Sequence, residues 1–114
     1  MHMNIMGMLR RRKFRALVRT QLALFEADHG VDVARAREAA SEAFRSGDVG
    51  AGIDHYAASD DLSEDLQDAL ETMVDTYAAA LDEAVARDYV REFERQAKAA
   101  YGDVVPRLQF PHWD

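Results

Sequence analysis

The chain has 114 residues, a length typical of a single domain with its own hydrophobic core. It contains no cysteine, which excludes disulfides, thiolate catalysis and cysteine-ligated zinc or iron–sulfur sites. Hydrophobic residues make up 48% and charged residues 31%, a balance that favours a globular fold over a disordered chain. No apolar run approaches the ~18 residues needed to cross a bilayer, and no signal-peptide core follows the basic cluster. We therefore expect a cytoplasmic or virion protein without membrane contact.

The net charge of −7 is unevenly distributed along the chain. Residues 1–20 contain six basic residues and no acidic one, whereas residues 46–86 contain eleven acidic residues and no Lys or Arg. This asymmetry predicts charged partners. Asp outnumbers Glu by 13 to 8 and Arg outnumbers Lys by 12 to 2, which suits a GC-rich genome and also the acidic surface of a halophilic protein. The acidity is therefore either adaptation to salt or a binding surface.

The first half of the chain predicts two short helices. Residues 1–8 are expected to form a flexible lead, with Met8 as an alternative translation start. A helix over 9–28 should end at Gly30, and a second over 33–46 should begin at the N-cap Asp32 and end at Gly47. Residues 48–58 predict a short helix or a structured loop. The expected buried stripe of the first helix is Phe14, Leu17, Val18, Gln21, Leu22, Leu24 and Phe25.

The second half predicts one long C-terminal helix. Residues 63–101 contain no Gly and no Pro, and a straight helix of that length would span ~58 Å at 1.5 Å per residue. Such a helix either bends near residues 78–86 or extends out of the monomer into an assembly. Gly102 should end it. The sequence as a whole predicts an all-α fold of three to four helices. They form a single domain over 9–102, which is followed by an extended tail over 103–114.

Two charged faces are candidate interaction surfaces. One side of the long helix carries the acidic face, Glu64, Asp68, Glu71, Asp75 and Asp82. It is either a solvated face, a wall that repels or guides nucleic acid, or a docking face for a basic partner. The N-terminal helix carries the basic face, Arg10, Arg11, Arg12, Lys13, Arg15 and Arg19. It is either a solvated helix start, a phosphate-binding surface, or a contact for an acidic neighbour such as residues 46–86 of another copy.

Nothing in the sequence predicts catalysis, a metal site or a cofactor. The four histidines lack metal-ligand spacing such as His-Glu-x-x-His, and no EF-hand loop is present. No Gly-x-Ser-x-Gly or phosphate-binding Gly-Lys-Ser/Thr motif occurs. We expect a protein that is not an enzyme.

The tail over 103–114 combines both prolines with large apolar side chains. Proline favours extended backbone, and aromatic side chains are frequent at the centres of protein interfaces. The tail either folds back on its own helices or anchors the subunit in a groove of a partner. The candidate docking residues are Val105, Leu108, Phe110 and Trp113.

In size, helical content, acidic face and aromatic tail, the chain resembles the small helical head–tail connector, or adaptor, proteins of tailed viruses. The resemblance implies a ring of subunits that docks on a portal through a terminal segment such as 110–113, with an acidic channel through which DNA slides. The sequence thus predicts a non-catalytic structural subunit of a larger assembly, a homo-oligomer with protein partners and nonspecific proximity to nucleic acid. The alternative is a small helical nucleic-acid-associated or regulatory protein that binds phosphates through its basic helix.

Overall fold

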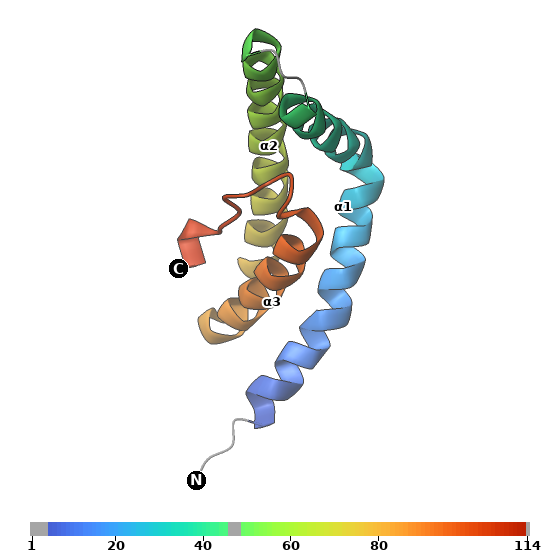
Figure 1. Ribbon diagram of the computed structural model, residues 1–114. Helices are drawn as coiled ribbons and strands as arrows, with labels where there is room; N and C mark the ends of the chain where they lie inside the picture. The colour runs from blue at the N-terminus through green and yellow to red at the C-terminus, as the bar shows by residue number, and fades with distance from the viewer. Residues whose placement is uncertain (1–4, 46–48, 114) are drawn as a thin grey trace.

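The computed structural model describes residues 5–45 and 49–113, with side chains described for 13–42, 45 and 61–113. Three α-helices, α1 (Ile5–Arg45), α2 (Val49–Ala78) and α3 (Glu83–Tyr101), are followed by a single 3-10 turn, η1 (Pro111–Trp113) (Figure 1). No strand occurs among the described residues, so the predicted all-α class is confirmed. The molecule is elongated, with extents of 59 × 30 × 22 Å.

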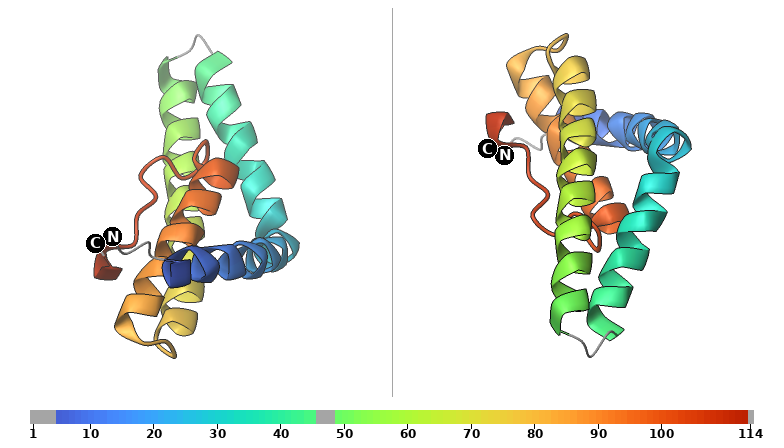
Figure 2. Two further views of the ribbon diagram at one scale, coloured as in Figure 1. Left: turned by 90° about the horizontal axis from the view of Figure 1, so that it is seen from below. Right: turned by 90° about the horizontal axis from the view of Figure 1, so that it is seen from above.

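Helix α1 is continuous where the sequence predicted two helices. It begins at Ile5, inside the expected lead, and passes through Gly30 to Arg45. A glycine inside a helix costs only about 1 kcal/mol relative to alanine. Burial of Phe25 and Val33 on either side of the glycine outweighs that cost. The predicted stop at Gly30 and the predicted N-cap role of Asp32 are therefore wrong. Figure 2 shows instead that α1 bends in its middle.

The predicted long helix over 63–101 is also wrong, because the chain turns at 79–82 between α2 and α3. This location agrees with the bend that was expected near 78–86. In the turn that follows α2 the backbone makes i→i−3 hydrogen bonds, from Ala80 N to Tyr77 O at 3.2 Å and from Leu81 N to Ala78 O at 3.0 Å. Asp82 then precedes α3 at its N-cap position. The two longest helices are thus α1 and α2, and the C-terminal helix has 19 residues.

The core lies where α3 packs in the angle of the bent α1 and against α2 (Figure 2). Its centre is aromatic: the ring of Tyr89 lies 5.5 Å from that of Phe14 and 4.6 Å from that of Tyr77. The hydroxyl of Tyr89 donates a 2.7 Å hydrogen bond to Gln21. Leu24, predicted as core, is instead 59% exposed on the outer side of α1.

Helix α3 ends at Tyr101, as the position of Gly102 predicted. A Cβ atom at residue 102 would lie 2.5 Å from the carbonyl oxygen of Lys98, so only glycine fits this close approach. The tail then crosses the middle of α2, where Gln67 bonds to Gln109, and ends beside Asp75 (Figure 1). No helix in the described part of the chain is long and apolar enough to span a membrane.

Candidate functional site

The predicted docking residues of the tail lie in the protein's own core. Val105 and Leu108 are each 3% exposed and Phe110 is 1% exposed. The Phe110 ring meets the Phe93 ring edge-to-face at 5.6 Å between centroids. Trp113 packs partly buried against the same core. Of the two roles that the sequence left open, the structure has the tail folded back, and a partner could reach Val105, Leu108 and Phe110 only after the tail had detached.

Side-chain hydrogen bonds to α2 fix the far end of the tail. Gln67 Nε2 donates to the carbonyl oxygen of Gln109 at 2.7 Å. The indole N–H of Trp113 donates to Asp75 Oδ1 at 3.1 Å. The backbone between these two bonds is therefore held against the acidic side of α2.

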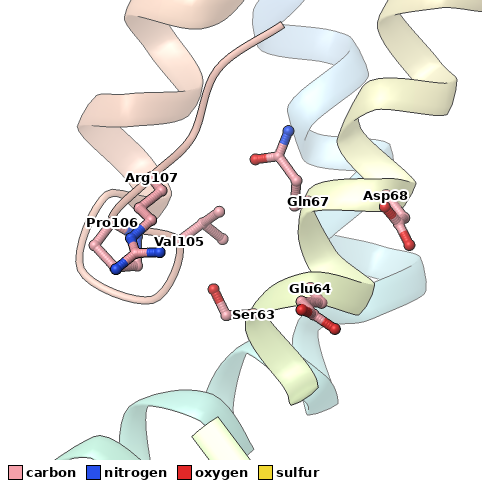
Figure 3. Close-up of a pocket in the computed structure, with 7 residues that line it drawn as sticks. All are labelled: Ser63, Glu64, Gln67, Asp68, Val105, Pro106 and Arg107. Atoms are coloured by element: carbon pink, nitrogen blue, oxygen red, sulfur yellow. The ribbon is translucent and has the colours of Figure 1, made fainter. Parts of the chain in front are cut away.

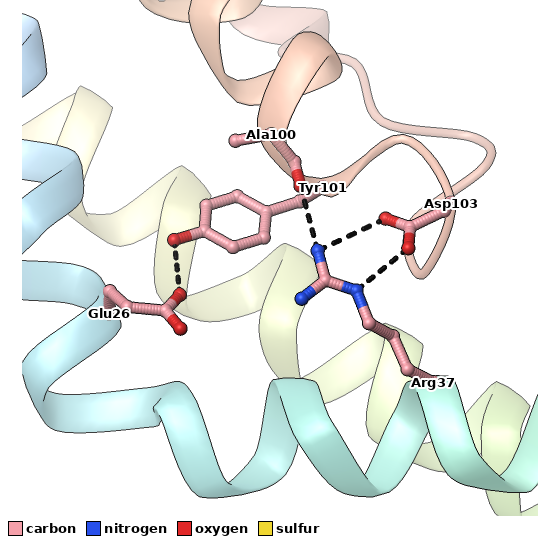
Figure 4. Close-up of polar contacts among 5 residues, drawn as sticks. All are labelled: Glu26, Arg37, Ala100, Tyr101 and Asp103. Atoms are coloured by element: carbon pink, nitrogen blue, oxygen red, sulfur yellow. Dashed lines mark hydrogen bonds and ion pairs between the residues drawn. The ribbon is translucent and has the colours of Figure 1, made fainter.

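The near end of the tail is fixed to α1 by a polar cluster (Figure 4). The Tyr101 hydroxyl donates to Glu26 Oε2 at 2.6 Å. The Arg37 guanidinium donates to Asp103 Oδ2 at 2.8 Å and to the carbonyl oxygen of Ala100 at 3.0 Å. The hydrogen bond from Arg37 holds the pKa of the Asp103 carboxyl below its usual value. Burial, reinforced by the bond to Glu26, raises the pKa of the Tyr101 hydroxyl.

The acidic face is shorter than the sequence predicted. Glu64 and Asp68 are exposed on α2, whereas Glu71 and Asp75, one and two turns further along, are half-buried beneath the tail. Asp82 does not continue this face, because it lies in the turn after α2. The described acidic face therefore consists of the four residues on α2, of which only the first two are fully open to solvent.

The basic face lies on the N-terminal half of α1. Arg10, Arg11 and Arg12 belong to the helix, but their side chains lie outside the described residues. Lys13, Arg15 and Arg19 are exposed. Among residues with described side chains, these three cations form no ion pair, and neither do Glu64 and Asp68. Neither of these surfaces of opposite sign is therefore neutralised by a described ion pair within the chain, although Arg15 interacts electrostatically with Glu92.

Arg15 also marks the contact of α1 with α3. Gln96 Nε2 donates to the Arg15 carbonyl oxygen at 2.9 Å and to Glu92 Oε2 at 2.6 Å. Glu92, 7% exposed, accepts two further hydrogen bonds from Arg95. Burial would raise the pKa of the Glu92 carboxyl, but these hydrogen bonds together outweigh it and lower that pKa. The charged groups at this contact between α1 and α3 are satisfied by hydrogen bonds within the chain, so we assign the contact a structural role.

A cleft of about 610 Å³ separates α2 from the tail (Figure 3). Its lining is polar on the α2 side and mixed on the tail side, and consists of Ser63, Glu64, Gln67, Asp68, Val105, Pro106 and Arg107. The buried Oε1 atom of Gln67 has no hydrogen-bond partner among the described residues. Ser63 is the only hydroxyl nucleophile of this lining, and no histidine accompanies it to act as its base.

No protein-family model, curated protein or solved structure matches the chain.

Two features escaped the sequence reasoning. Leu24 and Val31 are exposed on the outer side of α1, at 59% and 68%. Their seven-residue spacing places them on one helix face, which could have been noticed had α1 been expected to be continuous. The second feature joins His112 to Glu71 and Asp75 across the tail and α2. No sequence spacing reveals it, because 37 residues separate Asp75 from His112 and only the fold brings them together.

Proposed function

We propose that the protein is a non-catalytic structural subunit that assembles with copies of itself. In this assembly the basic face of one copy contacts the exposed end of the acidic face, Glu64 and Asp68, of the next. The observation that carries the proposal is the pair of exposed, oppositely charged surfaces that have no described ion-pair partner within the chain. Complementary charged surfaces steer association and fix its register.

The positions of the two faces favour a head-to-tail contact. The N-terminal half of α1 forms one end of the elongated molecule, whereas residues 64–68 lie on a different helix, near the middle of α2 (Figure 1). A contact between two different surfaces repeats from copy to copy, and closes into a ring when the rotation allows. Ring formation is also what the resemblance to head–tail connector proteins implies.

Exchange of charge between the faces tests the contact. Lys13→Glu/Arg19→Glu and Glu64→Lys/Asp68→Lys should each reduce the native mass, because each places like charges at every interface. In an equimolar mixture both kinds of interface regain opposite charges, so the mixture should recover the assembly. The matched control Arg35→Glu/Arg91→Glu makes the same charge change as the first variant at other exposed positions and should leave the native mass unchanged.

The same mixture separates this contact from a channel-lining role for the acidic face. If the acidic residues only faced a channel, Glu64→Lys/Asp68→Lys would assemble by itself and the mixture would show no rescue. Loss of assembly in both variants without recovery in the mixture would also overturn the proposed contact.

A second candidate function uses the same exposed cations, Lys13, Arg15 and Arg19, to bind nucleic-acid phosphates. Such binding weakens steeply with salt because counterions are released. A fluorescence-anisotropy titration of duplex DNA at about 50 and 200 mM salt distinguishes the candidates. The subunit proposal expects no measurable binding, whereas the alternative expects binding that Lys13→Glu/Arg19→Glu abolishes.

A further inference from the structure

Three side chains of types that bind metal ions converge at the end of the tail, beginning one helical turn beyond Asp68 of the contact proposed above. Glu71 and Asp75 lie one turn apart on the same face of α2, and His112 reaches them from η1. Each offers one ligand atom, and these atoms lie within 4.8 Å of one another. Tetrahedral ligands of Zn²⁺ lie about 3.3 Å apart, given bond lengths near 2.0–2.2 Å. None of the three side chains is fully buried, so small rotations can close the difference.

The fold holds His112 at this place through both of its neighbours. On one side, Pro111 restricts the backbone and Phe110 is buried against Phe93. On the other side, Trp113 donates its indole N–H to Asp75. A site whose ligands are positioned before the ion arrives loses little conformational entropy on binding.

The hydrogen bond from Trp113 also resembles the outer contacts of metal sites. Ligating carboxylates are commonly oriented by a hydrogen bond to one oxygen while the other binds the ion. Asp75 Oδ1 accepts the indole N–H at 3.1 Å, which leaves the second oxygen of this carboxylate for a ligand.

The charge of the two carboxylates also favours a cation at this place. Two carboxylates one turn apart repel each other, and residues 46–86 contain no Lys or Arg to offset them. In the part of the chain with described side chains, neither Glu71 nor Asp75 forms an ion pair. A bound cation would remove this repulsion.

The geometry points to a binding site for a divalent transition-metal ion of the Zn²⁺ type, formed by Glu71, Asp75 and His112. One imidazole nitrogen and two carboxylate oxygens suit such ions, whereas Mg²⁺ and Ca²⁺ prefer oxygen ligands alone. Three protein ligands leave a fourth position for water or for a group from a partner. Because its ligands come from α2 and from the end of the chain, the ion would fasten the tail to the helix.

The test is calorimetric titration of Zn²⁺ into the untagged, chelator-treated protein, followed in parallel by the fluorescence of Trp113, the only tryptophan. We expect one ion per chain and a change in emission, because Trp113 contacts a ligand. His112→Ala should weaken binding about tenfold or more, as should Glu71→Gln/Asp75→Asn. The matched control Glu64→Gln/Asp68→Asn alters an equally spaced acidic pair on the same face and should bind like the unaltered chain.

Three outcomes would overturn the site. They are absence of Zn²⁺ binding, binding that His112→Ala leaves unchanged, and Mg²⁺ or Ca²⁺ binding as tight as that of Zn²⁺. Circular dichroism of each variant checks that the helices remain folded. The titration is independent of the assembly proposal, because all three ligands belong to one chain.

Discussion

The hydroxyl of Tyr101 donates a 2.6 Å hydrogen bond to Glu26, across 75 residues of sequence. This bond joins the last residue of α3 to the middle of α1, close to the bend that lets α1 pack on both other helices. The neighbouring Arg37–Asp103 pair fastens the start of the tail to the same helix (Figure 4). Together they position the tail to run back over α2.

Removal of the Tyr101 hydroxyl tests this link. Tyr101→Phe should lower the free energy of unfolding by about 1 kcal/mol, the usual net value of one hydrogen bond. Because the pKa of Tyr101 is raised in the folded state, the unfolded state releases the proton first, and stability should fall as the pH rises above about 10. Urea unfolding between pH 8 and 11 should show a shallower alkaline decline for the variant. Tyr89, whose pKa burial also raises, would still contribute. An unchanged slope would contradict the role given to Tyr101.

For Glu92 we expect the opposite pH dependence of stability, in the acid range. Its folded pKa lies below the unfolded value, so its contribution is present above about pH 4.3 and is lost as the pH falls through the folded pKa. Glu92→Gln should cost about 1 kcal/mol at pH 7 and flatten the acid limb of the stability curve. Asp103→Asn is the matched comparison, since that carboxylate is also hydrogen-bonded but exposed, and should cost less. Equal effects of the two variants would contradict the importance given to burial.

The buried tail predicts a stability defect on its mutation. Phe110→Ala should lower the free energy of unfolding by about 3–5 kcal/mol, because it leaves a cavity against Phe93. The loosened tail should shift the emission of Trp113. Gln109→Ala, at an exposed side chain in the same segment, should change stability by less than about 0.5 kcal/mol. A Phe110→Ala variant as stable as the unaltered chain would restore the view of the tail as a free anchor.

Two nearby leucines on α1 test the orientation of that helix. Leu22 is 8% exposed and Leu24 is 59% exposed. In thermal unfolding, Leu22→Ala should lower the free energy of unfolding by about 2–5 kcal/mol, and Leu24→Ala should lower it by less than about 0.5 kcal/mol. Comparable losses would mean that α1 faces the core differently.

The helical class and most core positions follow from sequence periodicity, as Phe14, Val18 and Phe25 illustrate. The positions of the helix ends cannot be predicted in this way. Gly30 is a helix-stop residue by local preference, but packing on both sides of it keeps α1 intact. The turn after Ala78 contains neither Gly nor Pro, and the buried face of α3 has to fold back on α1 for the core to form. Tertiary contacts decide both cases.

Some of the candidate sites could likewise be predicted from the sequence, and others could not. The acidic face is visible in the sequence because its residues repeat with helical spacing, and the basic face because most of its residues are consecutive. Whether the tail packs on its own core or on a partner cannot be predicted from the sequence. An apolar segment suits either role, and only the fold shows which side chains surround it. The approach of His112 to Asp75 depends on two separate anchors of the tail, Phe110 and Trp113, and so appears only in three dimensions.

The native mass of the unaltered protein, measured by light scattering from low to multimolar salt, tests the subunit proposal most directly. We expect a mass that is a defined multiple of the 12.8 kDa chain at low ionic strength and that decreases as salt screens the charged contact. A mass of one chain at every salt concentration would contradict it. So would an assembly that salt strengthens, because the basic and acidic faces would then not hold it together.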